Sequence, residues 1–457
     1  MKQTFETKAA FRFGYGYSPH QKTPSDVPSL LAQVTDTDFG LTQFSGPNFA
    51  TRTELIATYV QHKRALKKGE ASANALAKQS GKALNQVMAA DFANTFSRSV
   101  FSPQSFRERL VFFWADHFTV VPKTRFARTI WGTYQETAIR PNIGGKFADL
   151  LIAATTHPSM VLFLDQDKST GPNSKRAKSK KKKRFSGLNE NLAREILELH
   201  TLGVLGGYTQ TDVRQLAELL TGLSSDKAGR RFRKSQSEPG EKTILGKTYG
   251  GGTGNLEDIE TFLRDVALHP NTAAHIARKL VVHFISDEPD PTLVDHLTEV
   301  FVQTDGDLLA LYTAMLEHPA AWVDLGQKAK QPYDFMVSSL RALGLTAKQT
   351  AKMNIRRQRE FFSNPISNMG QPILKTPGPN GWPEEVESWI TPHGIAARLN
   401  WALDITQELG ADLDPRTFVS STLHELAGET LQYAVAGAEQ RNEGLALVLI
   451  SPEFNRR

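Results

Sequence analysis

Apolar residues recur every three or four positions along most of this chain, and this spacing constrains the fold more than any other feature. In the segment 105–118, SFRERLVFFWADHF, it aligns Phe106, Leu110, Phe113 and His117 on one face of a helix. The same spacing occurs in four further segments: 146–155, 211–223, 271–285 and 391–405. Strand-like alternation of apolar and polar residues is rare. The sequence therefore predicts an all-α, multi-helix protein with long irregular loops.

Three stretches interrupt the helical pattern. Residues 166–187 are polar and basic and predict a mobile loop. Residues 224–256 predict an irregular excursion, in which KTILGKTY could contribute to one small β-hairpin. Residues 363–384 are rich in Pro, Gly and Asn and are expected to be non-helical. We expect a main helical body over 1–362 and a C-terminal helical portion, 363–457, that begins with this loop and packs on the body.

The composition excludes several kinds of chemistry. The chain of 457 residues has no cysteine, which removes thiol nucleophiles, disulfides and thiolate metal sites. No run approaches eighteen apolar residues, so no membrane-spanning helix is expected. The N-terminal segment lacks the apolar core of a signal peptide. As written, the chain is expected to be cytoplasmic, and an exported form stays open.

The positive charge of the chain is concentrated in one segment. Its net charge is +6, and Lys175–Arg184 alone contributes eight Lys and Arg, so the remainder is near neutral (+6 − 8 = −2). This segment could contact an acidic partner, an acidic polymer or another anionic ligand. It has no aromatic residue before Phe185, so base stacking is poorly supported and nucleic acid is not the expected partner.

The segment NENLAREILELHT, residues 189–201, is a helix with an unusual number of polar groups. At 100° per residue, Asn189 and His200 lie on its apolar side, and Glu195 lies between Leu188 and Leu202. An unpaired buried carboxylate costs several kcal/mol. Glu195 is therefore expected to meet a cation, a donor or a metal, or to be protonated.

Two interpretations of these polar groups stay open. His117, on the apolar face of the earlier helix, could meet Glu195 and His200 in a polar pocket, with Asp165 or Asp116 nearby. Such a pocket could act in acid–base catalysis or hold a divalent metal between helices. No metal-ligand spacing is present, so the metal and any cofactor are unknown. Alternatively, the histidines are satisfied core residues and Glu195 is an ion-paired helix anchor.

Four further residues are candidate ligand contacts. Asn189 lies beside His200 on the helix, and Arg194 could bind an anion, although it is also spaced for ion pairs with its helix neighbours. Tyr208 follows the glycines that end this helix and could reach back into the pocket. Trp382, within GPNGWPE, could stack on a flat ligand such as a sugar, or pack on the core.

Three His-Pro pairs follow apolar stretches, at His157, His269 and His318. Proline is common at the first position of a helix, and histidine is favoured at a helix C-terminus. The pairs therefore predict the end of one helix and the start of the next.

Several blocks together resemble one known family. RERLVFFWADHFTV, HPSMVLFLD, GLNENLAREILELHTLGVLGGYTQ and GQPILKTPGPNGWPE are similar to the bacterial domain-of-unknown-function 1800 family, and the resemblance covers nearly the whole chain. It implies a large, mainly helical protein, often exported and often encoded beside a sulfatase-like partner. It implies no activity and no catalytic residue.

Two hypotheses for function follow from these features. In the first, the protein is an enzyme whose site lies between the helices bearing His117 and His200, with Glu195 as acid, base or ligand. In the second, it is a non-enzymatic binding or assembly protein in which the polar helix is structural and the basic loop contacts an acidic partner. A cluster open to solvent favours the first, and a sealed cluster with all donors paired favours the second.

Overall fold

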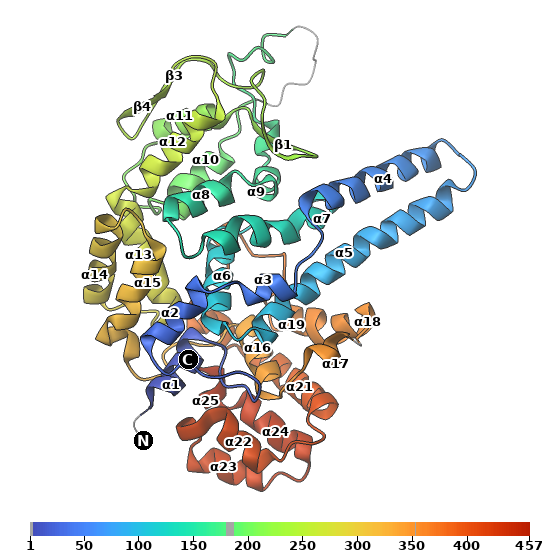
Figure 1. Cartoon of the computed structure of the whole chain (residues 1–457), viewed down its shortest axis with the longest axis vertical. Coiled ribbons are helices and arrows are strands. Elements are labelled where there is room, and N and C mark those ends of the chain that lie inside the picture. The colour runs from blue at the N-terminus through green and yellow to red at the C-terminus, as the bar shows by residue number, and fades with distance from the viewer. Residues whose placement is uncertain (1–2, 180–186, 352) are drawn as a thin grey trace.

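Helices make up most of the protein, as the apolar spacing predicts. The computed structural model describes residues 3–179, 187–351 and 353–457. They form an elongated body from which one helical hairpin projects (Figure 1), and the two termini lie near each other in its lower half. None of the helices in these residues is long and apolar enough to cross a membrane.

The first half of the chain supplies the central helices. Their bounds are α1 (Phe5–Lys8), η1 (Ala9–Phe13), α2 (Val27–Thr35), α3 (Phe39–Gln43), α4 (Phe49–Lys67), α5 (Ala73–Phe101), α6 (Ser105–His117), α7 (Arg125–Tyr134), η2 (Gln135–Ile139), η3 (Arg140–Asn142), α8 (Phe147–Thr155), α9 (Pro158–Phe163) and η4 (Gln166–Lys168). The segments η1 and η2 are π-helical turns.

The polar helix is regular only over its first half. It consists of α10 (Asn191–Glu195) followed by the π-helical turn η5 (Ile196–His200). The elements after it are α11 (Gln210–Leu220), α12 (Leu256–Ala267), α13 (Pro270–Phe284), α14 (Pro291–Gln303), α15 (Leu308–Glu317) and η6 (Pro319–Trp322).

Two antiparallel hairpins occupy the excursion that the sequence predicts. Strand β1 (Leu223–Asp226) pairs with β2 (Gly229–Phe232), and β3 (Glu241–Ile244) pairs with β4 (Lys247–Gly250). Leu245 and Gly246 both have positive φ, 50° and 78°, as the tight turn between β3 and β4 requires. The prediction of an all-α protein with a small β excursion is confirmed, with two hairpins in place of one.

The C-terminal part is again helical. Its elements are α16 (Pro332–Ala342), α17 (Ala347–Ala351), α18 (Ile355–Gln358), η7 (Arg359–Ser363), α19 (Asn364–Asn368), α20 (Val386–Trp389), α21 (Pro392–Leu409), α22 (Pro415–Leu423), η8 (His424–Leu426), α23 (Glu429–Ala436), α24 (Arg441–Ile450) and α25 (Pro452–Asn455). The expectation that 363–384 is non-helical is wrong at its start, because α19 occupies 364–368. Pro365 lies in the first turn of α19, where proline is tolerated.

Two large apolar clusters form the core. One collects buried side chains between Ala9 and Ala321, and the other joins Ala10, Phe11, Tyr15 and part of α5 to α16, α21, α22 and α24. The second cluster thus begins before residue 363, and the division of the chain at that point stays a prediction.

The three His-Pro pairs begin helices. His157, His269 and His318 are N-cap residues of α9, α13 and η6, and each ring Nδ1 accepts a hydrogen bond from the backbone N–H two residues later. The expected helix start at proline is confirmed. The dipole explanation is wrong, because each histidine satisfies a free N–H of the next helix.

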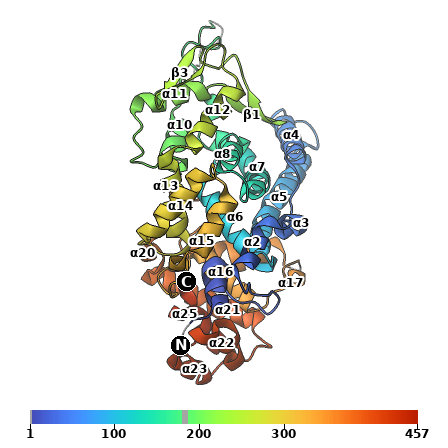
Figure 2. The same cartoon turned by 60° about the vertical axis from the view of Figure 1, so that its left-hand side comes forward.

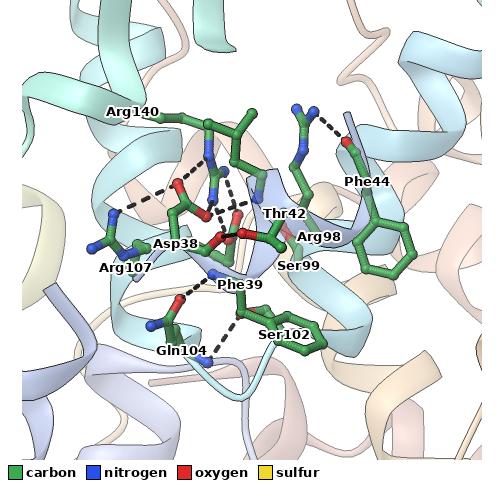
Figure 3. A network of polar contacts seen from close by, with 12 residues as sticks. Asp38, Phe39, Thr42, Phe44, Arg98, Ser99, Ser102, Gln104, Arg107 and Arg140 are labelled. Atoms are coloured by element: carbon green, nitrogen blue, oxygen red, sulfur yellow. Dashed lines mark hydrogen bonds and ion pairs between the residues drawn. The ribbon is translucent and has the colours of Figure 1, made fainter. Parts of the chain in front are cut away.

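A buried ionic cluster fixes the position of α6, which carries His117. Arg140 Nη2 lies 2.6 Å from both Asp38 Oδ1 and Glu108 Oε1, and Arg107 reaches Asp38 at 3.6 Å. Figure 3 shows Asp38, the N-cap of α3, Arg107 of α6 and Arg140 of η3 pointing toward one another. Gln104 accepts a hydrogen bond from the Phe39 N–H at 3.0 Å. Because Glu108 and Arg107 lie on α6, the cluster joins this helix to Asp38, which precedes it in the chain, and to Arg140, which follows it.

Candidate functional site

His117 and His200 meet in the interior, as the helical projection suggests. Their ring centroids are 6.0 Å apart, and His117 Nε2 lies 3.2 Å from the His200 carbonyl oxygen. Both side chains are buried, and neither Nδ1 has a hydrogen-bond partner among the described residues. Burial lowers the pKa of His200 to about 3 and holds that of His117 well below its ordinary value. The two rings are therefore neutral near pH 7.

A third imidazole, which the sequence interpretation did not select, joins them. The His275 ring lies 6.3 Å from that of His117, and its Nε2 lies 3.2 Å from the Leu199 carbonyl oxygen. Burial lowers its pKa to about 4. His275, Lys279 and His283 follow one another at every fourth position of α13. That spacing was visible in the sequence and could have identified this helix as a wall of the site.

The structure does not bring Glu195 to these histidines. It is half-buried at the end of α10, and it forms no hydrogen bond or ion pair with His117 or His200 within the described part of the chain. Burial and the neighbouring Glu198 raise its pKa to about 7, against the opposing effect of Arg194. With this pKa, Glu195 is partly protonated at neutral pH.

The other candidates on the polar helix make local contacts. The Asn189 side chain accepts the Asn191 N–H at 3.0 Å and donates to the Leu164 carbonyl at 2.8 Å. Arg194 pairs with Glu198 at 3.1 Å and Glu190 at 3.6 Å. Tyr208 reaches back to hydrogen-bond Glu198. These contacts hold the helix start and its following loop, and a ligand would have to compete with them.

Asp116 lines a pocket that differs from the one predicted between His117, Glu195 and His200. It precedes His117 on α6 but points to a different space, where the Trp382 N–H lies 3.1 Å from both carboxylate oxygens. Burial raises the pKa of Asp116 to about 7, although Lys279 and the Trp382 N–H oppose the shift. A carboxyl group with this pKa can both donate and accept a proton near neutrality.

Gly381 permits the close approach of the Trp382 loop to Asp116. Its φ is +81°, and a Cβ at this position would lie 2.4 Å from Asp116 Oδ2. The bulge of the loop onto α6 therefore requires glycine, for both its backbone conformation and its lack of a side chain.

Aromatic and polar side chains line the pocket beside Asp116. Its aromatic lining residues are Phe112, Trp131, Tyr134, Tyr333 and Trp382, and its hydroxyl and amide lining residues are Thr95, Thr119, Thr376, Gln135 and Gln371. The space between the walls, counted out to the solvent, is about 680 Å³. The Thr376 hydroxyl has no partner among the described residues. Trp382 lines this pocket and lies against Trp389, with 6.0 Å between the ring centroids, and its contact with a ligand stays a prediction.

A buried ionic network lies behind Asp116. Glu384, two residues after Trp382, pairs with His283 at 2.5 Å and with Lys328 at 3.1 Å. Burial alone would raise the pKa of Glu384, but these two partners lower it to about 2. Lys279 lies within electrostatic range of both Asp116 and Glu384, and burial lowers its pKa. At neutral pH Glu384 is therefore ionised, whereas Asp116 exchanges between its protonated and ionised forms.

The remaining sequence expectations concern a metal site, the place of Asp165 and the basic segment Lys175–Arg184. No group of three or more His, Asp or Glu among the described residues is arranged to hold a metal ion. Asp165 lies elsewhere, paired with Lys168 at 2.5 Å and Lys123 at 3.6 Å. Of the proposed anion-binding segment Lys175–Arg184, residues 180–184 lie outside the described part of the chain.

The buried histidines predict a pH-dependent stability. The unfolded chain binds protons on His200 below about pH 6.5, whereas the folded protein binds one only near pH 3. Stability from this group is therefore complete above pH 6.5 and is lost as the pH falls, by up to about 1.4 kcal/mol per pH unit. Urea unfolding at several pH values between 7 and 4 gives the slope of the unfolding free energy against pH. This slope should be smaller by about this amount in His200→Phe than in wild type. The exposed His393→Phe is the control, and an unchanged slope in His200→Phe would contradict the prediction.

Comparison with known proteins identifies a family but no characterised relative. A family model described as "Protein of unknown function (DUF1800)" matches residues 8–456. No curated protein and no solved structure matches the chain significantly.

Proposed function

The chain belongs to the DUF1800 family, whose description assigns no function, and we propose that it is an enzyme with Asp116 as its general acid. The observation that carries the proposal is a carboxyl group with a pKa of about 7 on the wall of an aromatic-lined pocket. General acids work best when their pKa is near the operating pH. Asp116 alone among the pocket's lining residues is acidic, so the proton would come from it.

The lining residues define a substrate class. No Lys or Arg lines the pocket, so an anionic group has no counter-charge there. Flat aromatic faces together with hydroxyl and amide groups suit a neutral, ring-shaped molecule whose hydroxyl groups need hydrogen bonds. We therefore expect acid-assisted hydrolysis of a neutral cyclic substrate, such as a glycoside or a cyclic ester, in which water attacks the reacting carbon and the Asp116 proton passes to the leaving oxygen.

The groups around Asp116 have separate roles in this proposal. The Trp382 N–H holds the carboxyl group in place, and Lys279 and Glu384 set its charge environment without lining the pocket. Two separated carboxyl pKa values are a common arrangement in acid–base sites. His117 and His200 do not line this pocket and are buried, so in this proposal they support its wall from inside the core.

A pH–rate profile tests the proposal. Wild-type protein is incubated with a panel of alkyl glycosides and lactones, whose alkoxide leaving groups need a proton, and the released products are quantified by chromatography. Because the acid is the protonated form of Asp116, kcat/KM should be level below about pH 7 and fall about tenfold per pH unit above it. No release from any probe, or a rate that is flat from pH 5 to 9, would count against it.

The second candidate is a binding protein that uses the same pocket without turnover. The observation that favours it is the local pairing of Asn189, Arg194 and Tyr208, which gives the polar helix a structural role. The discriminating result is a rise in melting temperature with a sugar or nucleoside that is recovered unchanged. The sulfatase-like partner stays an expectation of the family resemblance.

A further inference from the structure

The projecting hairpin of α4 and α5 carries a strong positive charge that the sequence analysis did not single out. Figures 1 and 2 show the two helices leaving the body side by side. Between residues 59 and 85 lie six cations, Lys63, Arg64, Lys67, Lys68, Lys78 and Lys82, against the single acid Glu70. We call residues 59–85 the basic arm.

The charges of the basic arm are free to meet a ligand. All six cations are exposed, and none of them forms an ion pair with a carboxylate within the described part of the chain. Elsewhere, exposed basic side chains such as Arg264 and Arg356 pair with nearby acids. An unpaired row of like charges opposes folding through self-repulsion, so its presence calls for an external counter-charge.

Part of this charge converges on a groove. Lys63 from α4, Lys78 and Lys82 from α5, and Arg125 from the start of α7 line a concave surface together with amide and hydroxyl groups from Asn74, Asn85 and Tyr59. Its space, counted out to the solvent, is about 690 Å³. Arg125 is held there by Tyr59 and Asn85 at 3.2 and 2.7 Å.

We propose that this groove binds an acidic polysaccharide. Its acid groups would meet Lys63, Lys78 and Lys82, and its hydroxyl groups would meet Asn74 and the free amide hydrogens of Asn85. The remaining cations, Arg64, Lys67 and Lys68, continue the charge toward the tip of the arm, beyond the groove. A compact anion would leave them unused, so the charge distribution favours an extended polymer.

Other polyanions fit the groove less well. Tyr59 is its only aromatic lining residue, the Arg125 guanidinium covers one face of that ring at 4.6 Å from the centroid, and the side chain also packs against a small apolar cluster, so base stacking is poorly supported. A membrane-binding helix buries a broad apolar face. The large apolar side chains exposed on the arm are only Val60, Leu66 and Leu76, each less than 40% exposed.

The proposal is tested with a fluorescent oligogalacturonate and anisotropy. Wild-type protein should bind this probe, more weakly as salt rises, because exposed charges are screened. The variant Lys63→Gln/Lys78→Gln/Lys82→Gln should bind about tenfold more weakly. These side chains are exposed and unpaired, so the variant should keep its fold, as checked by its melting temperature. The variant Lys175→Gln/Arg176→Gln/Lys178→Gln removes three charges elsewhere and should bind as wild type.

Several outcomes would overturn the proposal. They are no binding of the oligogalacturonate, equal binding by wild type and the arm variant, or loss of binding only in the Lys175 variant. Comparison probes test the ligand class: oligothymidylate and polyglutamate of equal charge, and phosphatidylglycerol vesicles. Each should bind more weakly than the saccharide, and equal or tighter binding of any of them would overturn the saccharide assignment. None of these results depends on the Asp116 pocket.

Discussion

Replacing Asp116 by Asn is expected to lower kcat/KM on a responsive probe by about 10²–10⁴-fold, the usual contribution of general acid catalysis. Asparagine has the same shape and can still accept the Trp382 N–H. It also resembles the protonated carboxyl group that dominates below pH 7, so the fold should be kept. What it cannot do is give up a proton. The measurement is the initial rate at pH 6, with the melting temperature as a check on folding.

Glu195→Gln is the matched control for this experiment. Glu195 also has a pKa raised to about 7 by burial, and the substitution makes the same chemical change, but its side chain does not line the Asp116 pocket. It should therefore keep its activity. Loss of activity in Glu195→Gln with full activity in Asp116→Asn would move the site to the polar helix, where the sequence analysis placed it.

The helical periodicity predicted the architecture because apolar spacing is a local property. The helices over 105–117, 211–220 and 270–284 all contain their predicted apolar rows. The polar helix was harder to predict, because projection at 100° per residue assumes one continuous α-helix. In the structure it begins only at Asn191 and changes to a π-helical turn at Ile196. A wider turn shifts every side chain after it, and Glu195 precedes this change whereas His200 follows it.

The candidate site could be predicted only in part. His117 on its apolar face and Trp382 in its rigid loop were selected from their surroundings in the sequence. The bonds that define the Asp116 pocket join residues 266 positions apart, and Glu384 meets His283 across 101 positions. Such contacts follow from the packing of distant segments and leave no local pattern. In the sequence, Asp116 was one of two acids, with Asp165, that could lie near the pocket. Its hydrogen bond from the Trp382 N–H, which distinguishes it, is visible only in the structure.

The basic arm illustrates a different limit. The net charge of the chain singled out Lys175–Arg184, because the residues outside that segment have a net charge of −2. A near-neutral sum is compatible with strong local charge, however, when acids and bases occupy different surfaces. The hairpin carries residues 59–85 away from the body, and Glu70 is the single acid among them. Composition therefore could not show this surface, whereas a charge count along each predicted helix could have.

Arg140→Met is expected to destabilise the protein by about 3–5 kcal/mol, the usual cost of removing one partner from a buried ionic cluster. Burial alone would lower the pKa of Arg140, but Glu108 and Asp38 outweigh it and raise the pKa above its ordinary value. Without the guanidinium, Glu108 keeps a side chain only 3% exposed and has lost both hydrogen bonds from Arg140. Urea unfolding at pH 7 measures the change.

Two further variants distinguish the loss of a buried ionic partner from the loss of any ion pair. Arg264→Met removes the same side chain from an exposed pair with Asp149, in which both partners are more than half exposed, and should cost less than about 1 kcal/mol. Arg140→Met/Glu108→Met removes the stranded carboxylate and should recover a large part of the loss, because an apolar pair can replace a buried ionic one. If Arg140→Met were as mild as Arg264→Met, the cluster would not be what holds α6, and with it Asp116 and His117, in place.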